Sequence, residues 1–234
     1  MYTTQPQLED LGPLKVLRVK GDPSAPTIII FHGYGASAFD LFSLHQVLNV
    51  PQGTNWIFPD GHLKIPLGPG YFGSAWFPID MEALQRAVMM GTVRDLTEVT
   101  HPGLDLARKN ALEMIEASGI KLDNIVIGGF SQGAMLSTEI TLQSNIRPKG
   151  LVLLSGTLLH RNIWADLAKS KSSLSFFQSH GKVDPVLGFK AAKELNKLLR
   201  DAGMVGEFVE FNGGHEIPTE VIDGLNRYLK QILG

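Results

Sequence analysis

The chain has 234 residues, of which 44% are hydrophobic and 19% are charged, and its formal net charge is −2. This composition is typical of a globular protein with a sizeable core, and the near-neutral charge gives no electrostatic reason to expect nucleic acid or an anionic membrane as a partner. The absence of cysteine excludes disulfides and thiolate metal sites and fits a reducing compartment. The first ten residues lack the regions of a signal peptide, and no apolar run approaches the ~20 residues that span a bilayer. We therefore expect a cytoplasmic protein without stable membrane insertion.

The predicted elements alternate between strand and helix from the start of the chain. Residues 14–19 alternate apolar and charged side chains, which predicts a half-exposed strand. Residues 27–31 are continuously apolar and rich in β-branched side chains, which predicts a strand buried on both faces, as in a parallel sheet. Ser37 and Asp40 form a capping pattern ahead of a helix with one apolar face, and residues 56–60 predict another short strand.

Residues 61–103 interrupt this alternation. Glycine, proline and aromatic residues crowd the first part, and a short amphipathic stretch from Met81 to Met90 lies in the second. An irregular segment of this length inside a domain is usually functional or disordered, and its aromatic content argues against disorder. We interpret it as a wall or lid over a pocket. The candidate substrate-binding residues in it are Tyr71, Phe72, Trp76 and Phe77. Met89 and Met90 fit pocket lining and core packing equally well.

Regular alternation returns in the second half of the chain. Helices are predicted at 104–118, 134–140, 163–168, 188–202 and from about 218, and strands at 124–127, 151–155, 174–178 and 208–211. With no repeat or linker, we expect a single domain over residues 1–234. The alternation predicts an α/β fold with a mostly parallel central sheet and helices on both faces. Functional loops of such sheets gather at the carboxyl ends of the strands. Four unusual loops follow strands there, at 32–36, 128–134, 180–185 and 212–216.

The pattern Gly-x-Ser-x-Gly runs from Gly129 to Gly133, with Ser131 at its centre. A β-branched stretch precedes it and a helix-forming stretch follows it, which is the context of a nucleophile elbow. The turn is so tight that a Cβ at either glycine would collide with neighbouring backbone. The alternative is an ordinary turn without activity, and only suitable partner residues decide between the two.

A serine hydroxyl needs a base, usually imidazole, and a carboxylate that orients that base. In α/β-hydrolases these groups follow the chain order Ser, Asp or Glu, His, each after a strand. Ser131, Asp184 and His215 have this order. His180 precedes Asp184, so we interpret it as a brace for the acid loop, and His32 as a brace for the loop in which it lies. The histidines form no metal-spaced cluster, and we expect neither a metal nor a cofactor.

Acyl transfer also needs hydrogen-bond donors for the developing oxyanion. The elbow supplies the backbone N–H of Gln132, the residue after the nucleophile. The second donor should come from the loop after the strand at 27–31. In this loop we choose the backbone N–H of Tyr34, with Gly35 and Ala36 as less favoured donors.

Four motifs together resemble the phospholipase/carboxylesterase family, which includes acyl-protein thioesterases and small bacterial carboxylesterases. They lie at residues 32–35, 128–133, 179–186 and 213–217. The resemblance covers nearly the whole chain and implies an α/β-hydrolase fold without a large cap domain. It also implies hydrolysis of carboxylic esters or thioesters without a cofactor, and it offers a homodimer as a candidate assembly.

The family motifs assign roles to five residues. Ser131 matches the nucleophile, Asp184 the acid and His215 the base, and Tyr34 and Gln132 match the oxyanion donors. The chain departs from the family at Ala36, Ser37 and Pro78, where acidic residues are common, and these departures alter the edge of the pocket.

We therefore predict a serine carboxylesterase that hydrolyses esters of small to medium apolar acyl groups through an acyl-enzyme intermediate. A close alternative is an acyl-protein thioesterase or lysophospholipase acting on long acyl chains. An alternative from another class is a hydrolase-fold binding protein without turnover, against which the complete set of three groups argues. The expected partner is a small-molecule ester or thioester.

Overall fold

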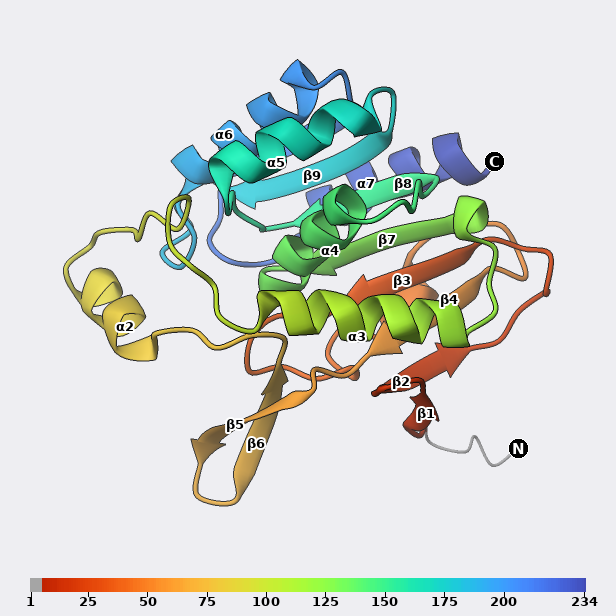
Figure 1. The fold of residues 1–234 in the computed structure, drawn as a ribbon, viewed down its shortest axis with the longest axis horizontal. Helices are drawn as coiled ribbons and strands as arrows, with labels where there is room; N and C mark the ends of the chain where they lie inside the picture. The colour runs from red at the N-terminus through yellow and green to blue at the C-terminus, as the bar shows by residue number, and fades with distance from the viewer. Residues whose placement is uncertain (1–5) are drawn as a thin grey trace.

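An eight-stranded sheet crosses the molecule in the order β1-β2-β4-β3-β7-β8-β9-β10 (Figure 1). This computed structural model describes residues 6–234; residues 1–5, which belong to the predicted domain and N-terminal stretch, lie outside the described residues. The strands are β1 (Glu9–Leu11), β2 (Leu14–Val19), β3 (Thr27–Phe31), β4 (Asn55–Pro59), β7 (Ile125–Phe130), β8 (Gly150–Leu154), β9 (Ser175–Gly181) and β10 (Val205–Phe211). The strands from β4 to β10 in this order are parallel, and β1 and β2 are antiparallel additions at one edge. The sheet is thus mostly parallel, as predicted.

Helices cover both faces of this sheet (Figure 1). They are α1 (Leu44–Val47), α3 (Leu104–Ala117), α4 (Gln132–Gln143), α5 (Arg161–Ala168), α6 (Phe189–Asp201) and α7 (Thr219–Leu233), with short 3-10 turns at Leu122–Asn124 and Lys169–Lys171. Successive strand residues point to opposite faces. Ile29 and Ile127 therefore join a core with α3 to α6, whereas Ile28 and Val126 join a second core with α1 and α7. Both faces of β3 and β7 are buried, which explains their continuous apolar runs.

The predicted helix after Ser37 is mostly a series of turns. The side chain of Asp40 accepts hydrogen bonds from both the backbone N–H and the hydroxyl of Ser37, each at 2.7 Å. The backbone N–H groups of Asp40, Phe42 and Leu44 then bond to carbonyls three residues earlier, not four. The capping pattern therefore closes a tight turn, and only the single turn of α1 is helical.

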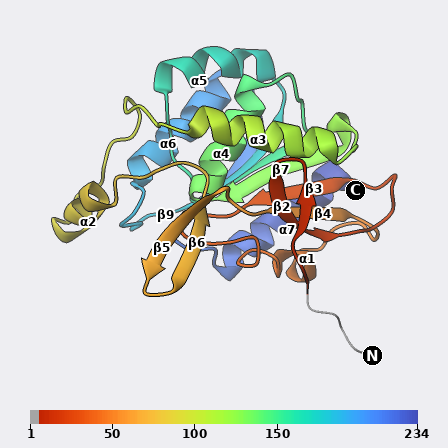
Figure 2. The ribbon, with the colours of Figure 1, turned by 60° about the horizontal axis from the view of Figure 1, so that its bottom comes forward.

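Residues 61–103 are more regular than the sequence suggests. They contain a hairpin of β5 (Leu63–Gly68) and β6 (Tyr71–Ala75), which the sequence analysis missed, and a helix α2 (Met81–Met89). The hairpin pairing shifts register between Pro66 and Gly68, so these two residues interrupt the alternation that would mark a strand. The hairpin and α2 project from the rest of the molecule (Figure 2). Among residues 6–234 no separate cap domain stands over the sheet.

No helix between residues 6 and 234 combines the length and the apolar character needed to cross a bilayer.

Candidate active site

Ser131 lies in the turn between β7 and α4, at the carboxyl edge of the sheet. Its backbone has φ 55° and ψ −117°, which a residue other than glycine adopts only under strain. A Cβ at Gly129 would lie 2.4 Å from the carbonyl carbon of Gly133, and one at Gly133 would lie 2.0 Å from the oxygen of Phe31. The chain can turn this sharply only because both positions lack a side chain.

Ser131, Asp184 and His215 form a hydrogen-bonded chain. His215 Nε2 lies 2.8 Å from Ser131 Oγ, and His215 Nδ1 lies 2.6 Å from Asp184 Oδ2. Asp184 follows β9 and His215 follows β10, and because these strands are adjacent and parallel, their loops meet at one edge. With the Nδ1–H donating to the carboxylate, Nε2 is free to accept the hydroxyl proton.

The environment of Asp184 keeps it ionised. Burial by itself would raise the pKa of this carboxyl, but the hydrogen bond and charge of His215 lower it. The backbone N–H groups of Val186 and Leu187 also donate to Oδ1, at 2.8 and 2.9 Å. These contacts outweigh burial and hold the pKa of Asp184 below its usual range. The carboxylate can therefore orient the imidazole of His215 and stabilise its protonated form.

His180 lies beside the acid but does not reach the serine. Its Nε2–H donates to the carbonyl oxygen of Leu187 at 2.8 Å, and the same nitrogen lies 3.4 Å from Asp184 Oδ2. Burial lowers the pKa of His180, which keeps the imidazole neutral. Its position is that of a brace for the loop that carries Asp184.

The three candidate oxyanion donors in the loop after β3 differ in whether their backbone N–H groups are already bonded. Gly35 N–H donates to Ser74 O at 2.9 Å, and Ala36 N–H donates to Gly33 O at 3.3 Å, so both less favoured donors are occupied. Within residues 6–234 the N–H of Tyr34 has no partner. The N–H of Gln132 opens α4 and has no acceptor inside the helix. Tyr34 and Gln132 also share a cavity with Ser131, so the two predicted donors remain available.

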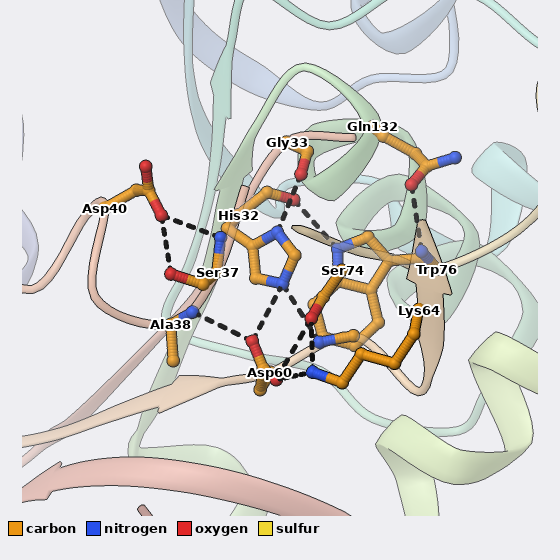
Figure 3. A network of polar contacts seen from close by, with 11 residues as sticks. His32, Gly33, Ser37, Ala38, Asp40, Asp60, Lys64, Ser74, Trp76 and Gln132 are labelled. Atoms are coloured by element: carbon orange, nitrogen blue, oxygen red, sulfur yellow. Dashed lines mark hydrogen bonds and ion pairs between the residues drawn. The ribbon is translucent and has the colours of Figure 1, made fainter. Parts of the chain in front are cut away.

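A buried polar network supports this loop (Figure 3). His32 Nδ1–H donates to the carbonyl of Gly33 at 2.7 Å, and His32 Nε2 accepts from the N–H of Gly61 at 2.9 Å. Burial lowers the pKa of His32, so the ring is neutral and can both donate and accept. The indole Nε1–H of Trp76 donates to the carbonyl of His32 at 2.8 Å. The loop after β3 is thus held from both sides.

Asp60 and the side chain of Gln132 complete the network, and sequence reasoning gave neither of them a role. Asp60 is buried and accepts from Ala38 N–H at 3.1 Å and from Lys64 Nζ at 2.9 Å. The Gln132 carboxamide accepts from Trp76 N–H at 2.9 Å (Figure 3) and donates to Phe77 O at 2.7 Å. The position of Asp60 directly after β4, at the edge that carries Ser131, was the available signal for its role.

A cavity of about 560 Å³ opens beside Ser131. Residues 77–102 form most of its wall, α4 adds Met135, and the acid loop adds Leu187. Apart from Asp80 and Arg94 its larger side chains are mainly apolar, including Phe77, Ile79, Leu84, Leu96 and Val99. A larger cavity of about 720 Å³ lies at the amino ends of β3 and β7 and contains none of the residues named above as catalytic candidates. Of these two cavities, the apolar one at Ser131 is therefore the one that can present a substrate to the serine.

The four predicted substrate-binding aromatics separate in the structure. Phe77 lines the cavity, but Trp76 is fully buried behind it and serves the network around His32. Tyr71 and Phe72 do not line it, because they lie on the projecting hairpin, where 75% and 67% of their surface is exposed. Met89 and Met90 are exposed as well and belong to neither the cavity nor the core.

Comparison with known proteins gives a consistent result. A family model described as Phospholipase/Carboxylesterase matches residues 14–233. Acyl-protein thioesterase 1 of Candida albicans is 27% identical over 228 residues, which cover 91% of this chain and 94% of that protein. A probable carboxylesterase of Arabidopsis thaliana (SOBER1-like) is 26% identical and covers 95% of this chain and 84% of its own. The Bacillus cereus carboxylesterase structure superposes with a TM-score of 0.70 at 21% identity, covering 94% of each chain.

Proposed function

Because the chain belongs to the phospholipase/carboxylesterase family and is a serine hydrolase of the α/β-hydrolase fold, we propose that it is a carboxylesterase. Its substrates would be carboxylic esters with small to medium apolar acyl groups. The observation that carries this proposal is the chain of hydrogen bonds from Ser131 Oγ through His215 to Asp184. That chain opens onto a cavity with apolar walls.

In the first step His215 Nε2 removes the proton of Ser131 as Oγ attacks the ester carbonyl carbon. The negative charge moves to the carbonyl oxygen, where the N–H groups of Tyr34 and Gln132 stabilise it. A single such donor typically contributes about 10²–10³ in rate. The carbon–oxygen bond to the alcohol then breaks, and the protonated His215 donates its proton to the leaving oxygen.

In the second step water attacks the acyl-enzyme. His215 accepts a proton from the water, the same two N–H groups stabilise the second tetrahedral oxyanion, and the Ser131 oxygen leaves with that proton. Asp184 keeps the imidazole in the required tautomer throughout. The products are the carboxylic acid and the free enzyme.

The size and lining of the cavity support the preference for small to medium apolar acyl groups. A volume of about 560 Å³ lies within the usual range of small-molecule sites. Each acyl methylene that it buries contributes about 0.8 kcal/mol to binding. We therefore expect kcat/KM to rise with acyl length until the chain meets the charged side chains of Asp80 and Arg94, which also line the cavity.

An acyl-protein thioesterase is the second candidate. The Candida albicans relative has that name, and its similarity to this chain extends over nearly the full length of both. The same serine, base and oxyanion donors can attack a thioester. Comparing kcat/KM for an ester and a thioester of one acyl group would separate the two. A large preference for the thioester would favour this second function.

The catalytic proposal is tested by labelling with a fluorophosphonate. We expect one adduct on Ser131 and none on Ser131→Ala, which should also fail to hydrolyse a panel of p-nitrophenyl esters. His180→Gln is a matched control for His215→Gln, since both rings contact Asp184 but only His215 reaches Ser131. Equal losses in the two variants, or no adduct on Ser131, would contradict the mechanism; the latter would favour a binding protein without turnover.

A homodimer and a cytoplasmic location stay predictions. Light scattering of the purified protein would test the first, and fractionation of the source cells would test the second.

A further inference from the structure

Two cavities meet at Ser131. The larger of these two is the apolar cavity of about 560 Å³ that is proposed to hold the acyl group. The second has a volume of about 340 Å³ and lies between the loop after β3 and the loop after β10. Its lining shares Tyr34, Ser131 and His215 with the larger cavity. The residues that belong to the second cavity alone are Gly33, Ala36, Asp40, Leu41, Phe130 and Ile217. A bound ester can therefore extend from the reacting carbonyl in two directions.

Of the two cavities at Ser131, the one of about 560 Å³ is suited to the acyl group. Burial of an aliphatic chain against its many apolar side chains contributes about 0.8 kcal/mol per methylene. The wall of this cavity can also hold the acyl chain while that chain is bonded to Ser131. The second cavity is then left for the alcohol or thiol. His215 lines it as well, as the proton donor to the leaving atom must.

The second cavity carries one charge that is not neutralised. Among the described residues that line it, Asp40 is the only acidic or basic side chain apart from His215, whose partner is Asp184. Asp40 Oδ2 accepts from Ser37, but no cationic side chain among residues 6–234 lies within 4 Å of the carboxylate. The neighbouring cation Lys64 points at Asp60 and Ser74 instead (Figure 3). In contrast, the larger cavity contains both Asp80 and Arg94.

We infer that the second cavity binds the leaving group and that Asp40 makes the enzyme prefer leaving groups with a positive charge. This inference rests on the proposed esterase function and deepens it by assigning a charge class to the alcohol or thiol. A cation near the carboxylate is attracted through a partly aqueous path, whereas an anion is repelled. Asp40 acts here as a specificity-determining residue and takes no part in bond breaking.

Esters of one short acid with three alcohols of similar size test this inference. The alcohols are choline, its uncharged isostere 3,3-dimethylbutanol, and 2-sulfoethanol, which is anionic. In Asp40→Asn we expect the ratio of kcat/KM for the choline ester to that for the dimethylbutyl ester to fall about 3–10-fold, while the neutral ester stays within about twofold. The sulfoethyl ester should improve by a similar factor. Raising the salt concentration should shrink both effects in the wild type, since screening weakens exposed charges.

Asp166→Asn is the matched control. Asp166 carries the same charge on the surface of α5, where it pairs with Lys169 and lines neither cavity. Its removal should leave the three ratios unchanged. The asparagine at position 40 keeps an oxygen that can accept from Ser37, so the turn at residues 37–40 is retained.

Three results would overturn the inference. The ratios could be the same in wild type and Asp40→Asn, or Asp166→Asn could shift them equally. The charge effect could also follow the acid instead of the alcohol, which ethyl esters of betaine and of its uncharged isostere 3,3-dimethylbutanoic acid would reveal. These outcomes leave the esterase proposal intact if turnover depends on Ser131. Turnover of all three esters that is equal in wild type and Ser131→Ala would overturn both.

Discussion

The side chain of Gln132 offers the sharpest test of how the cavity wall is joined to the nucleophile elbow. This carboxamide is fully buried and makes two hydrogen bonds to the backbone of the adjoining segment, one with Trp76 N–H and one with Phe77 O. Gln132→Met keeps a side chain of similar length but removes both partners. The backbone N–H of residue 132, the proposed oxyanion donor, is unchanged by the substitution.

The expected cost follows from the two groups left unpaired. A buried backbone donor or acceptor without a partner costs about 1–3 kcal/mol, so Gln132→Met should lower the free energy of unfolding by about 2–6 kcal/mol. For a chain of this size that corresponds to a fall in Tm of roughly 5–20 °C. Because Phe77 begins the wall of the larger cavity, we also expect kcat/KM to fall more for longer acyl groups than for acetyl esters.

Urea unfolding followed by tryptophan fluorescence measures the first effect, and the p-nitrophenyl ester panel measures the second. Gln143→Met is the matched control, since it makes the same change at the exposed end of the same helix. That control should stay within about 0.5 kcal/mol of the wild type. If the two variants are equally stable, or if Gln132→Met loses less than about 1 kcal/mol, the wall is not held to the elbow by these bonds.

Three further predictions follow from the same geometry. Asp184→Asn should lower kcat by on the order of 10³–10⁴ with little change in KM, because the imidazole loses its orientation; a loss below tenfold would contradict the role of Asp184. Combined Tyr71→Ser and Phe72→Ser should leave kcat/KM for a short ester within about twofold, because neither residue lines the cavity; a tenfold loss would place the hairpin in substrate binding. The free energy of unfolding should decrease as pH falls below 6.5. Burial lowers the pKa of His32 and His180, so the unfolded chain then binds protons that the native state does not. The slope is up to about 1.4 kcal/mol per pH unit for each group, and urea unfolding at pH 7 and pH 5.5 should show it, with a smaller change in His180→Gln.

The sequence determined the sheet and the three residues of the hydrogen-bonded chain. The strands of the parallel core are short runs that carry apolar side chains, and each of Ser131, Asp184 and His215 closely follows one of them. In a parallel sheet the carboxyl ends of all strands share one edge, so the order of motifs along the chain already places these residues close together. The glycines around Ser131 add a local requirement that the sequence displays directly. For this reason the fold class and the triad needed no knowledge of distant contacts.

Tertiary contacts alone decided which part of residues 61–103 faces the substrate. Gly35 N–H bonds to Ser74 O, and Ser74 N–H bonds to Ala36 O, so β6 is attached to the loop after β3. A Cβ on Gly73 would lie 2.0 Å from Gly35 O, which shows how closely the two backbones pass. That attachment directs the hairpin away from the cavity, buries Trp76 and leaves Phe77 at the wall. An aromatic residue has the same apolar character on the hairpin, in the core and at the cavity wall. Only the packing of segments that are distant in sequence decides which of these places it occupies.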